Sequence, residues 1–202
     1  SPETNTFGTL SIDVIPRYIT CACPLDFETV AGGDKFGNIF VLQIPDNAST
    51  VDFATLSGPQ TLWSGDAGEK MNRFKDLTQF HVGEVITSIV KKPMVIGGAD
   101  ILVYTTIMGS VGTLYPFVSA EDADFFVLLE IAMRREIEIL SGWRHIGYRG
   151  FYAPVKHTID GDLCELFSTL PTESQKEIAS TLDCKIEEIL KKIEDTRNVA
   201  YF

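Results

Sequence analysis

The chain has 202 residues, which is long for one ordinary domain and short for two. Hydrophobic residues make up 45% and charged residues 22%, a composition that excludes a wholly disordered chain. The formal net charge of −11 makes the chain a poor candidate for binding nucleic acid through phosphate neutralisation alone. No initiator methionine is present, so we expect an excised or processed piece of a longer protein.

The strand-like regions are residues 7–45 and 77–118, where β-branched and aromatic runs alternate with turns such as residues 35–38. Between them, residues 46–75 keep no period of two or of 3.6, which predicts a long loop. We expect strands over these ranges: 18–23, 28–34, 39–44, 77–82, 85–90, 101–108 and from 111 or 113 to 118.

A short internal repeat runs through the strand-like regions. Residues 34–40 align with residues 109–115, and in both copies a glycine turn leads into an apolar strand. With the 46–75 loop left out, the spacing matches the roughly 40–45 residues of a propeller blade. The repeat favours about two blades of a WD40-like β-propeller, although a β-sandwich would have similar strands.

The pattern becomes helical at Ser119, which forms a capping box with Asp122. Apolar residues then recur every three or four positions as far as Leu140, and Gly142 ends the helix. Further apolar residues on the other sides predict that the first half of this helix is buried nearly all round.

The tail predicts three shorter helices. Asp160 or Asp162 caps the first, Thr172 and Gln175 form a capping box for the second, and the last carries a single apolar face. The predicted fold class is mainly β with a C-terminal helical part (α+β). We divide the chain into propeller blades and a helical C-terminal domain with a connecting segment: residues 1–118, 119–202 and 143–157.

The four cysteines are too few for a disulfide scaffold in a chain of this length and form no C-x-x-C pair. They are typical of small hydrophobic residues in an intracellular protein. The start of the sequence has no basic region followed by an apolar run, so we expect no secretory signal. The uncharged stretch 101–120 is long enough to cross a bilayer, but its glycines, Pro116 and alternation favour a hairpin. We therefore expect no membrane association.

The densest polar run lies at residues 157–165. His157 and Cys164 would suit nucleophilic catalysis, and the carboxylates would suit a metal ion. The favoured interpretation is that Asp160 and Asp162 cap a helix, because the acidic residue that would complete a calcium loop is missing. We predict no catalytic residue, no cofactor and no metal.

The connecting segment, residues 143–157, combines aromatic rings with positive charge, and no acidic residue lies between Glu138 and Asp160. This mixture suits base stacking on single-stranded nucleic acid, and it suits a protein interface, where Trp, Tyr and Arg are the usual anchors. It also suits packing of the strands onto the helices. The candidate partner-interface residues are Trp143, Arg144, Tyr148, Arg149 and Tyr152.

Five runs carry a family likeness: TVAGGDKFGNI, FHVGE, LVYTT, PVK and IDGDLCE, at residues 29–39, 80–84, 102–106, 154–156 and 159–165. Together with the ending, which includes Arg197 and Tyr201-Phe202, they resemble the C-terminal region of the splicing factor 3b subunit 3 family. The run DKFGN favours this branch over its relatives, damaged-DNA-binding protein 1 and the large subunit of the cleavage and polyadenylation specificity factor.

The resemblance implies a non-catalytic scaffold of three β-propellers, with this chain supplying closing blades and the C-terminal helical domain. It implies a nuclear subunit of the splicing factor 3b (SF3b) complex of the U2 small nuclear ribonucleoprotein (U2 snRNP), acting in branch-site recognition during pre-mRNA splicing. The implied partners are the HEAT-repeat subunit and a small SF3b subunit, with RNA bound indirectly through the complex. The alternative is an adaptor like damaged-DNA-binding protein 1, serving a ubiquitin ligase or a nucleic-acid-binding complex. Open blade edges would let the isolated chain self-associate.

Overall fold

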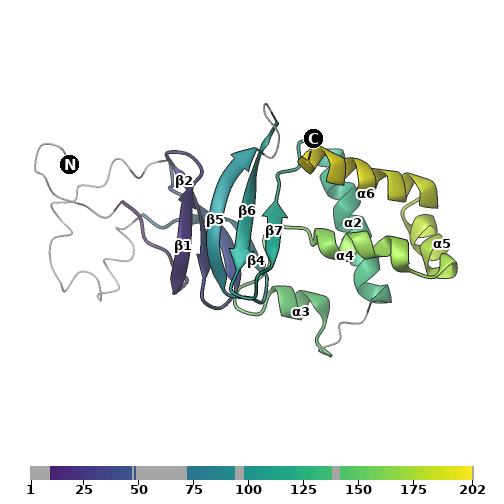
Figure 1. The fold of residues 1–202 in the computed structure, drawn as a ribbon, viewed down its shortest axis with the longest axis horizontal. Coiled ribbons are helices and arrows are strands. Elements are labelled where there is room, and N and C mark those ends of the chain that lie inside the picture. The colour runs from purple at the N-terminus through teal and green to yellow at the C-terminus, as the bar shows by residue number, and fades with distance from the viewer. Residues whose placement is uncertain (1–9, 47, 49–71, 94–97, 138–141, 202) are drawn as a thin grey trace, which may run out of the picture.

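The computed structural model describes residues 10–46, 48, 72–93, 98–137 and 142–201. Two antiparallel sheets precede a group of helices along the chain, and Figure 1 shows the sheets on one side of the molecule and most of the helices on the other. The architecture therefore has the expected strands followed by a C-terminal helical part.

The first sheet contains four strands in chain order: β1 (Ile19–Pro24), β2 (Thr29–Asp34), β3 (Asn38–Gln43) and β4 (Lys75–His81). Asp34 holds the turn between β2 and β3, because its Oδ1 accepts from the backbone N–H groups of Phe36 at 2.8 Å and Asn38 at 3.0 Å. Gly37 adopts a φ of +86° in this turn, a conformation that favours glycine. These strands lie within two residues of the predicted ranges.

The second sheet contains three strands: β5 (Ile86–Pro93), β6 (Asp100–Thr106) and β7 (Val111–Leu114). β6 and β7 end earlier than predicted, at 106 rather than 108 and at 114 rather than 118. The turn after β6 explains the first difference, since the Gly109 N–H already donates to the Thr106 carbonyl at 3.1 Å. Pro116 explains the second, because it has no N–H to donate to a neighbouring strand.

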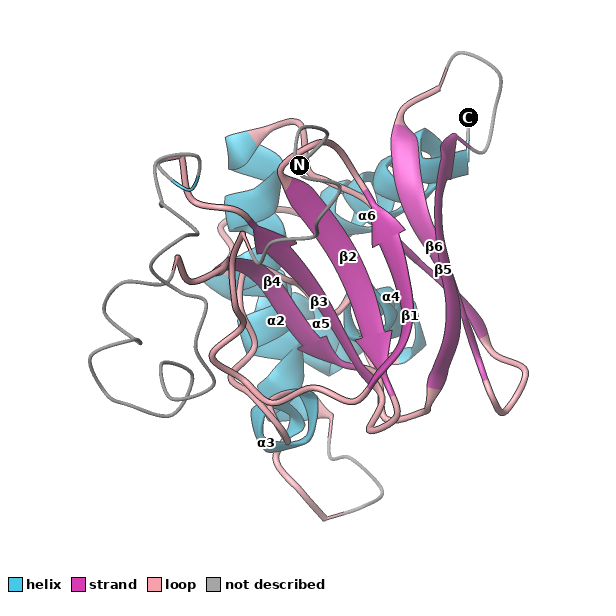
Figure 2. Cartoon of the chain, turned by 90° about the vertical axis from the view of Figure 1, so that its left-hand side faces the viewer, coloured by secondary structure: helices cyan, strands magenta, loops and turns pink. Residues whose placement is uncertain are grey.

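The two sheets share one apolar core. β1 lies beside β5 (Figure 2), and the Thr20 hydroxyl donates to the Ile86 carbonyl across this junction. A Cβ on Gly33 of β2 would lie 2.6 Å from the Ile86 side chain, so the glycine lets β5 approach closely. The buried residues of this strand core are Ala31, Ile39, Val41, Ile86 and Ile89.

Five helices and a 3₁₀ turn complete the described chain: α2 (Ala120–Glu136), α3 (His145–Arg149), α4 (Gly161–Glu165), η3 (Leu166–Thr169), α5 (Thr172–Thr181) and α6 (Ile186–Tyr201). All except α3 contribute to a second apolar core, which contains none of the strand-core residues. Its buried members are Phe126, Leu129, Ala132, Met133, Leu163, Cys164, Phe167, Ile178, Ala179 and Ile189.

Two predicted helix caps are confirmed and one is wrong. The Asp122 N–H donates to the Ser119 hydroxyl at 3.3 Å at the start of α2, and Asp160 caps α4. Thr172 and Gln175 form no capping box, because α5 begins directly after Pro171 and the Gln175 amide donates instead to the preceding 3₁₀ turn.

Two predictions for α2 are also wrong. The helix ends at Glu136, with Ile137 extended at φ −107°, and does not continue to Leu140, which lies outside the described residues. Its first half is not buried all round, because the other helices pack against one side only. The exposed apolar side chains of α2 are Val127, Leu128 and Ile131.

Most of the predicted 46–75 loop lies outside the described residues. Among the helices that the structure describes, none has the length and apolar character needed to cross a bilayer.

Candidate protein interface

The segment 143–157 is attached to an edge of the first sheet. After α3 the backbone of Lys156 pairs with Gln79 of β4, each N–H donating to the other residue's carbonyl at 3.0 and 3.1 Å. Figure 1 shows α3 at the end of the sheet, apart from the other helices. The candidate residues therefore lie where strands and helices meet.

A buried carboxylate joins this segment to the helical core. Asp160 Oδ2 accepts from His145 Nε2 at 2.7 Å and from Arg149 Nε at 2.6 Å, so His145 carries its hydrogen on Nε2. Asp160 Oδ1 accepts from the Leu163 N–H at 3.3 Å, which caps α4. The Asp160 N–H donates at 3.1 Å to Glu130 of α2. One residue thus connects α2, α3 and α4.

The charge of Asp160 is held in place by these partners. Burial by itself raises the pKa of the Asp160 carboxyl, but the His145 hydrogen bond and the charge and hydrogen bond of Arg149 together hold the pKa below its usual range. The carboxylate therefore remains ionised at neutral pH, and Arg149 balances it inside the molecule.

Two of the predicted interface residues dock α3 onto β4. Arg149 Nη1 donates to the His81 carbonyl at 3.2 Å, and its guanidinium carbon lies 4.8 Å from the centre of the Phe80 ring. The Tyr148 hydroxyl donates to the Val82 carbonyl at 3.2 Å. Both side chains are half-buried, so they supply packing between the strands and α3.

Tyr152 also makes internal contacts. Its ring stacks on Phe36 with centres 5.4 Å apart, and its hydroxyl donates to the Pro16 carbonyl. Tyr18 packs edge-on against Phe36 at 5.5 Å. Sequence reasoning did not single out Tyr18 or Phe36. The available signal was Phe36 itself, because a phenylalanine in a tight turn lies at the surface and needs another exposed ring to pack against.

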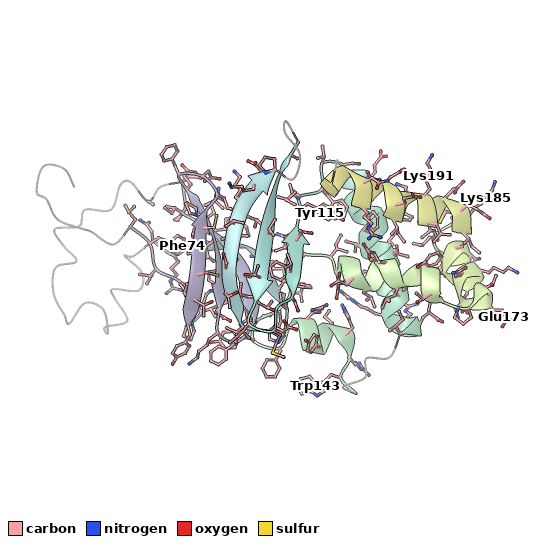
Figure 3. The ribbon with its side chains drawn as sticks, viewed as in Figure 1. Phe74, Tyr115, Trp143, Glu173, Lys185 and Lys191 are labelled. Carbon is pink, nitrogen blue, oxygen red and sulfur yellow. The ribbon has the colours of Figure 1, made fainter. Side chains whose placement is uncertain are left out.

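The remaining two candidates, Trp143 and Arg144, are exposed. Trp143 is 55% exposed and lies 5.7 Å from the ring of Phe151, which is 59% exposed. Ile146 on α3 is 54% exposed. Figure 3 shows the Trp143 side chain beyond α3, directed away from the body of the molecule. We call Trp143, Arg144, Ile146 and Phe151 the α3 face.

The polar run at 157–165 does not assemble a nucleophilic pair. Cys164 is 1% exposed in the helical core, and burial raises the pKa of its thiol, which disfavours the reactive thiolate. His157 is exposed, and its Nδ1 lies 3.0 Å from the Leu77 carbonyl of β4. Within the described ranges, no group of three or more histidine, cysteine, aspartate or glutamate side chains gathers where a metal ion could bind.

The α3 face thus lies over a buried support in which Arg149 pairs with Asp160. The sequence matches the CPSF A subunit region family over residues 1–169, and the chain belongs to this family.

Three relatives indicate the branch. The chain is 44% identical over 187 residues to Spliceosome-associated protein 130 A of Arabidopsis thaliana, covering 92% of this chain and 15% of the relative. It is 42% identical over 186 residues to Splicing factor 3B subunit 3 of Danio rerio, with coverage of 92% and 15%. It is 41% identical over 201 residues to Pre-mRNA-splicing factor rse1 of Neurospora crassa, with coverage of 99% and 17%. The chain thus spans about one sixth of the length of these relatives.

Proposed function

We propose that the chain is part of a non-catalytic scaffold subunit of a splicing factor 3b-type complex. The observation that carries the proposal is the identity of 41–44% across nearly the whole chain with proteins named as splicing factors. The parent protein then acts in pre-mRNA splicing and branch-site recognition within the U2 snRNP, in the nucleus. It acts by holding other proteins, and it needs no catalytic residue or cofactor of its own.

The strands are the closing blades of a propeller in this proposal. The first sheet has four antiparallel strands joined in chain order, which is how a blade is built. The second sheet, with three strands, is an incomplete blade. Residues 1–118 then form one unit and residues 119–202 a helical domain, a division supported by two apolar cores with no buried residue in common.

The proposed partners are other SF3b subunits, including the HEAT-repeat subunit and a small subunit, while RNA is held indirectly. The exposed Trp143 and Arg144 contact a partner, Tyr148 and Arg149 hold α3 in place beside β4, and Tyr152 packs on Phe36 nearby. The acidic surface agrees with this role, because a net charge of −11 opposes direct phosphate binding.

Affinity purification of the full-length parent protein, followed by mass spectrometry of its partners, tests the proposal. We expect co-purification of splicing factor 3b subunits and of U2 snRNP components. Recovery of cullin-type ubiquitin ligase components in their place would favour the damaged-DNA-binding type of adaptor and contradict the proposal.

A further inference from the structure

The helix that carries the α3 face is anchored to the rest of the protein by hydrogen bonds. Tyr148 and Arg149 fix α3 to β4 from below, and His145 fixes it to Asp160. Trp143, Ile146 and Phe151 are each more than half exposed on top of this support. The rings of Trp143 and Phe151 lie 5.7 Å apart, and exposed apolar side chains on a fixed support are typical of a binding site, since little conformational entropy is lost on binding.

The charges around this face are sorted by sign. The two nearby aspartates point inward: Asp160 is 3% exposed and bound by Arg149, and Asp34 is fully buried and bound by Asn38. The cationic side chains point outward. Arg144, Lys35 and Lys156 are exposed, and none forms an ion pair with a carboxylate of the described chain. Three exposed cations therefore lie in this region of a protein of net charge −11, while the half-buried carboxylate of Glu84 accepts from the Thr106 and Ser110 hydroxyls.

We propose that the α3 face binds a short acidic peptide segment of a partner protein, anchored by an aromatic or aliphatic side chain. The anchor packs on Trp143 and Phe151, and the flanking carboxylates pair with Arg144 and the neighbouring lysines. Trp and Arg at the centre of a contact are the usual anchors of protein interfaces. The inference rests on the proposed scaffold function and specifies the chemistry of one of its partners.

Single-stranded RNA suits this surface less well. Successive bases stack on parallel ring planes, but the two rings of the α3 face, Trp143 and Phe151, are tilted by 58° to each other, and the neighbouring Phe36 and Tyr152 already stack on each other. Ile146 has no π-face. Three exposed cations are few for a phosphate backbone approaching so acidic a protein.

The test uses the 202-residue chain and three labelled probes in fluorescence anisotropy at physiological salt. The first probe is a twelve-residue peptide with a Leu-Phe pair between runs of Asp and Glu. The second has Gln and Asn in place of the acids, and the third is a uridine dodecamer. We expect the acidic peptide to bind at least tenfold more tightly than either control probe.

Four variants locate the binding. Trp143→Ala and Arg144→Glu should each weaken binding of the acidic peptide about tenfold, a change of about 1.4 kcal/mol. Their matched controls, Leu128→Ala and Lys185→Glu, alter an exposed apolar side chain of α2 and an exposed cation beside α6, and should leave the affinity unchanged. Circular dichroism establishes that each variant is folded.

Three outcomes would overturn the inference: tighter binding of the uridine dodecamer, equal binding of the two peptides, or an equal loss in the control variants. The result is independent of co-purification of the parent protein. Peptide binding without splicing factor 3b partners would contradict only the proposed function, whereas those partners without peptide binding would contradict only this inference.

Discussion

Asp160 accepts hydrogen bonds from an imidazole, a guanidinium and a backbone N–H inside the protein. Removing it takes the hydrogen-bond acceptor away from the half-buried Arg149 and the buried His145. Breaking a buried charged pair in this way is strongly destabilising. We expect Asp160→Ala to lower the free energy of unfolding by about 3 kcal/mol, measured by urea denaturation with circular dichroism. Asp162→Ala, at an exposed position two residues further along, is the control. An equal loss in both variants would contradict this role.

His81 predicts a pH dependence near neutrality. Burial, aided by the nearby charge of Arg149, lowers the pKa of His81, so the unfolded chain binds more protons than the folded chain just below the ordinary value of about 6.5. Stability should therefore fall as the pH drops from 7.5 to 5.5. His81→Asn should reduce this fall, as measured by urea midpoints at both pH values. An unchanged slope in the His81 variant would exclude the assignment.

Single residues were predictable from the sequence where their partners are close along the chain. Ser119 and Asp160 cap helices through N–H groups three residues away, and both caps follow from local spacing. Arg17 was not predictable, because its side chain, 2% exposed, pairs with Asp76 and donates to Gln79, about sixty residues away. Arg149 is similar: its charge indicated a surface residue, and its partners become visible only when α3 lies on β4.

Gly83 lies between β4 and β5 and sets how closely α3 approaches the end of β4. It adopts a φ of +96°, and a Cβ there would lie 1.9 Å from the Tyr148 hydroxyl. Gly109 adopts a φ of +89° with nothing within 4 Å of its Cβ direction. We expect Gly109→Ala to cost about 1–2 kcal/mol of stability through backbone strain alone. Gly83→Ala should lower the stability further, because it also displaces Tyr148. Thermal denaturation of both variants measures the two losses.

A third variant separates strain from collision. Adding Tyr148→Phe to Gly83→Ala removes the colliding hydroxyl, so the double variant should lie closer in stability to Gly109→Ala. If Gly83→Ala and Gly109→Ala are equally stable from the start, the close approach of Tyr148 is not a packing constraint.

Strands were predicted more accurately than helix burial. Alternation and turn residues place β1 to β4 within two residues, because both signals are local. The all-round apolar composition of α2 indicated burial on every side, but burial depends on which elements surround the helix. Leu128 is 55% exposed because the described helices cover only the opposite side of α2.

At the scale of the whole molecule, β7 leaves a sheet edge unpaired among the described strands, with an exposed apolar side chain on it. β7 pairs with β6 on one side, no described strand pairs with its other side, and Val111 at its start is 69% exposed. We expect the isolated chain to self-associate through this edge, since unpaired strands recruit further strands. Sedimentation velocity at rising concentration measures the association.

Two matched lysine variants identify the surface that associates. Val111→Lys should reduce self-association, because a charge on an edge strand opposes pairing. Leu128→Lys alters the exposed side of α2 and should not. A monomeric unmodified chain, or a loss of association only in the α2 variant, would contradict association through β7.

The order of strands followed by helices was predictable from the sequence, but the number of strands in each sheet was not. The change from a period of two to a period of 3.6 at Ser119 separates strands from helices, and the structure follows it. The number of strands in a sheet depends on which segments pair in space, and the second sheet has three strands in the described part of the chain.

Each apolar core also contains its own chemical reporter. Cys164 is buried in the helical core, Cys21 packs against the strand core, and burial raises the pKa of both thiols. Alkylation by iodoacetamide should therefore be slow at both positions in the native state and should accelerate when the surrounding core opens. Mass spectrometry of the two cysteine peptides would follow the opening of the strands and of the helices separately, in a chain of unaltered sequence.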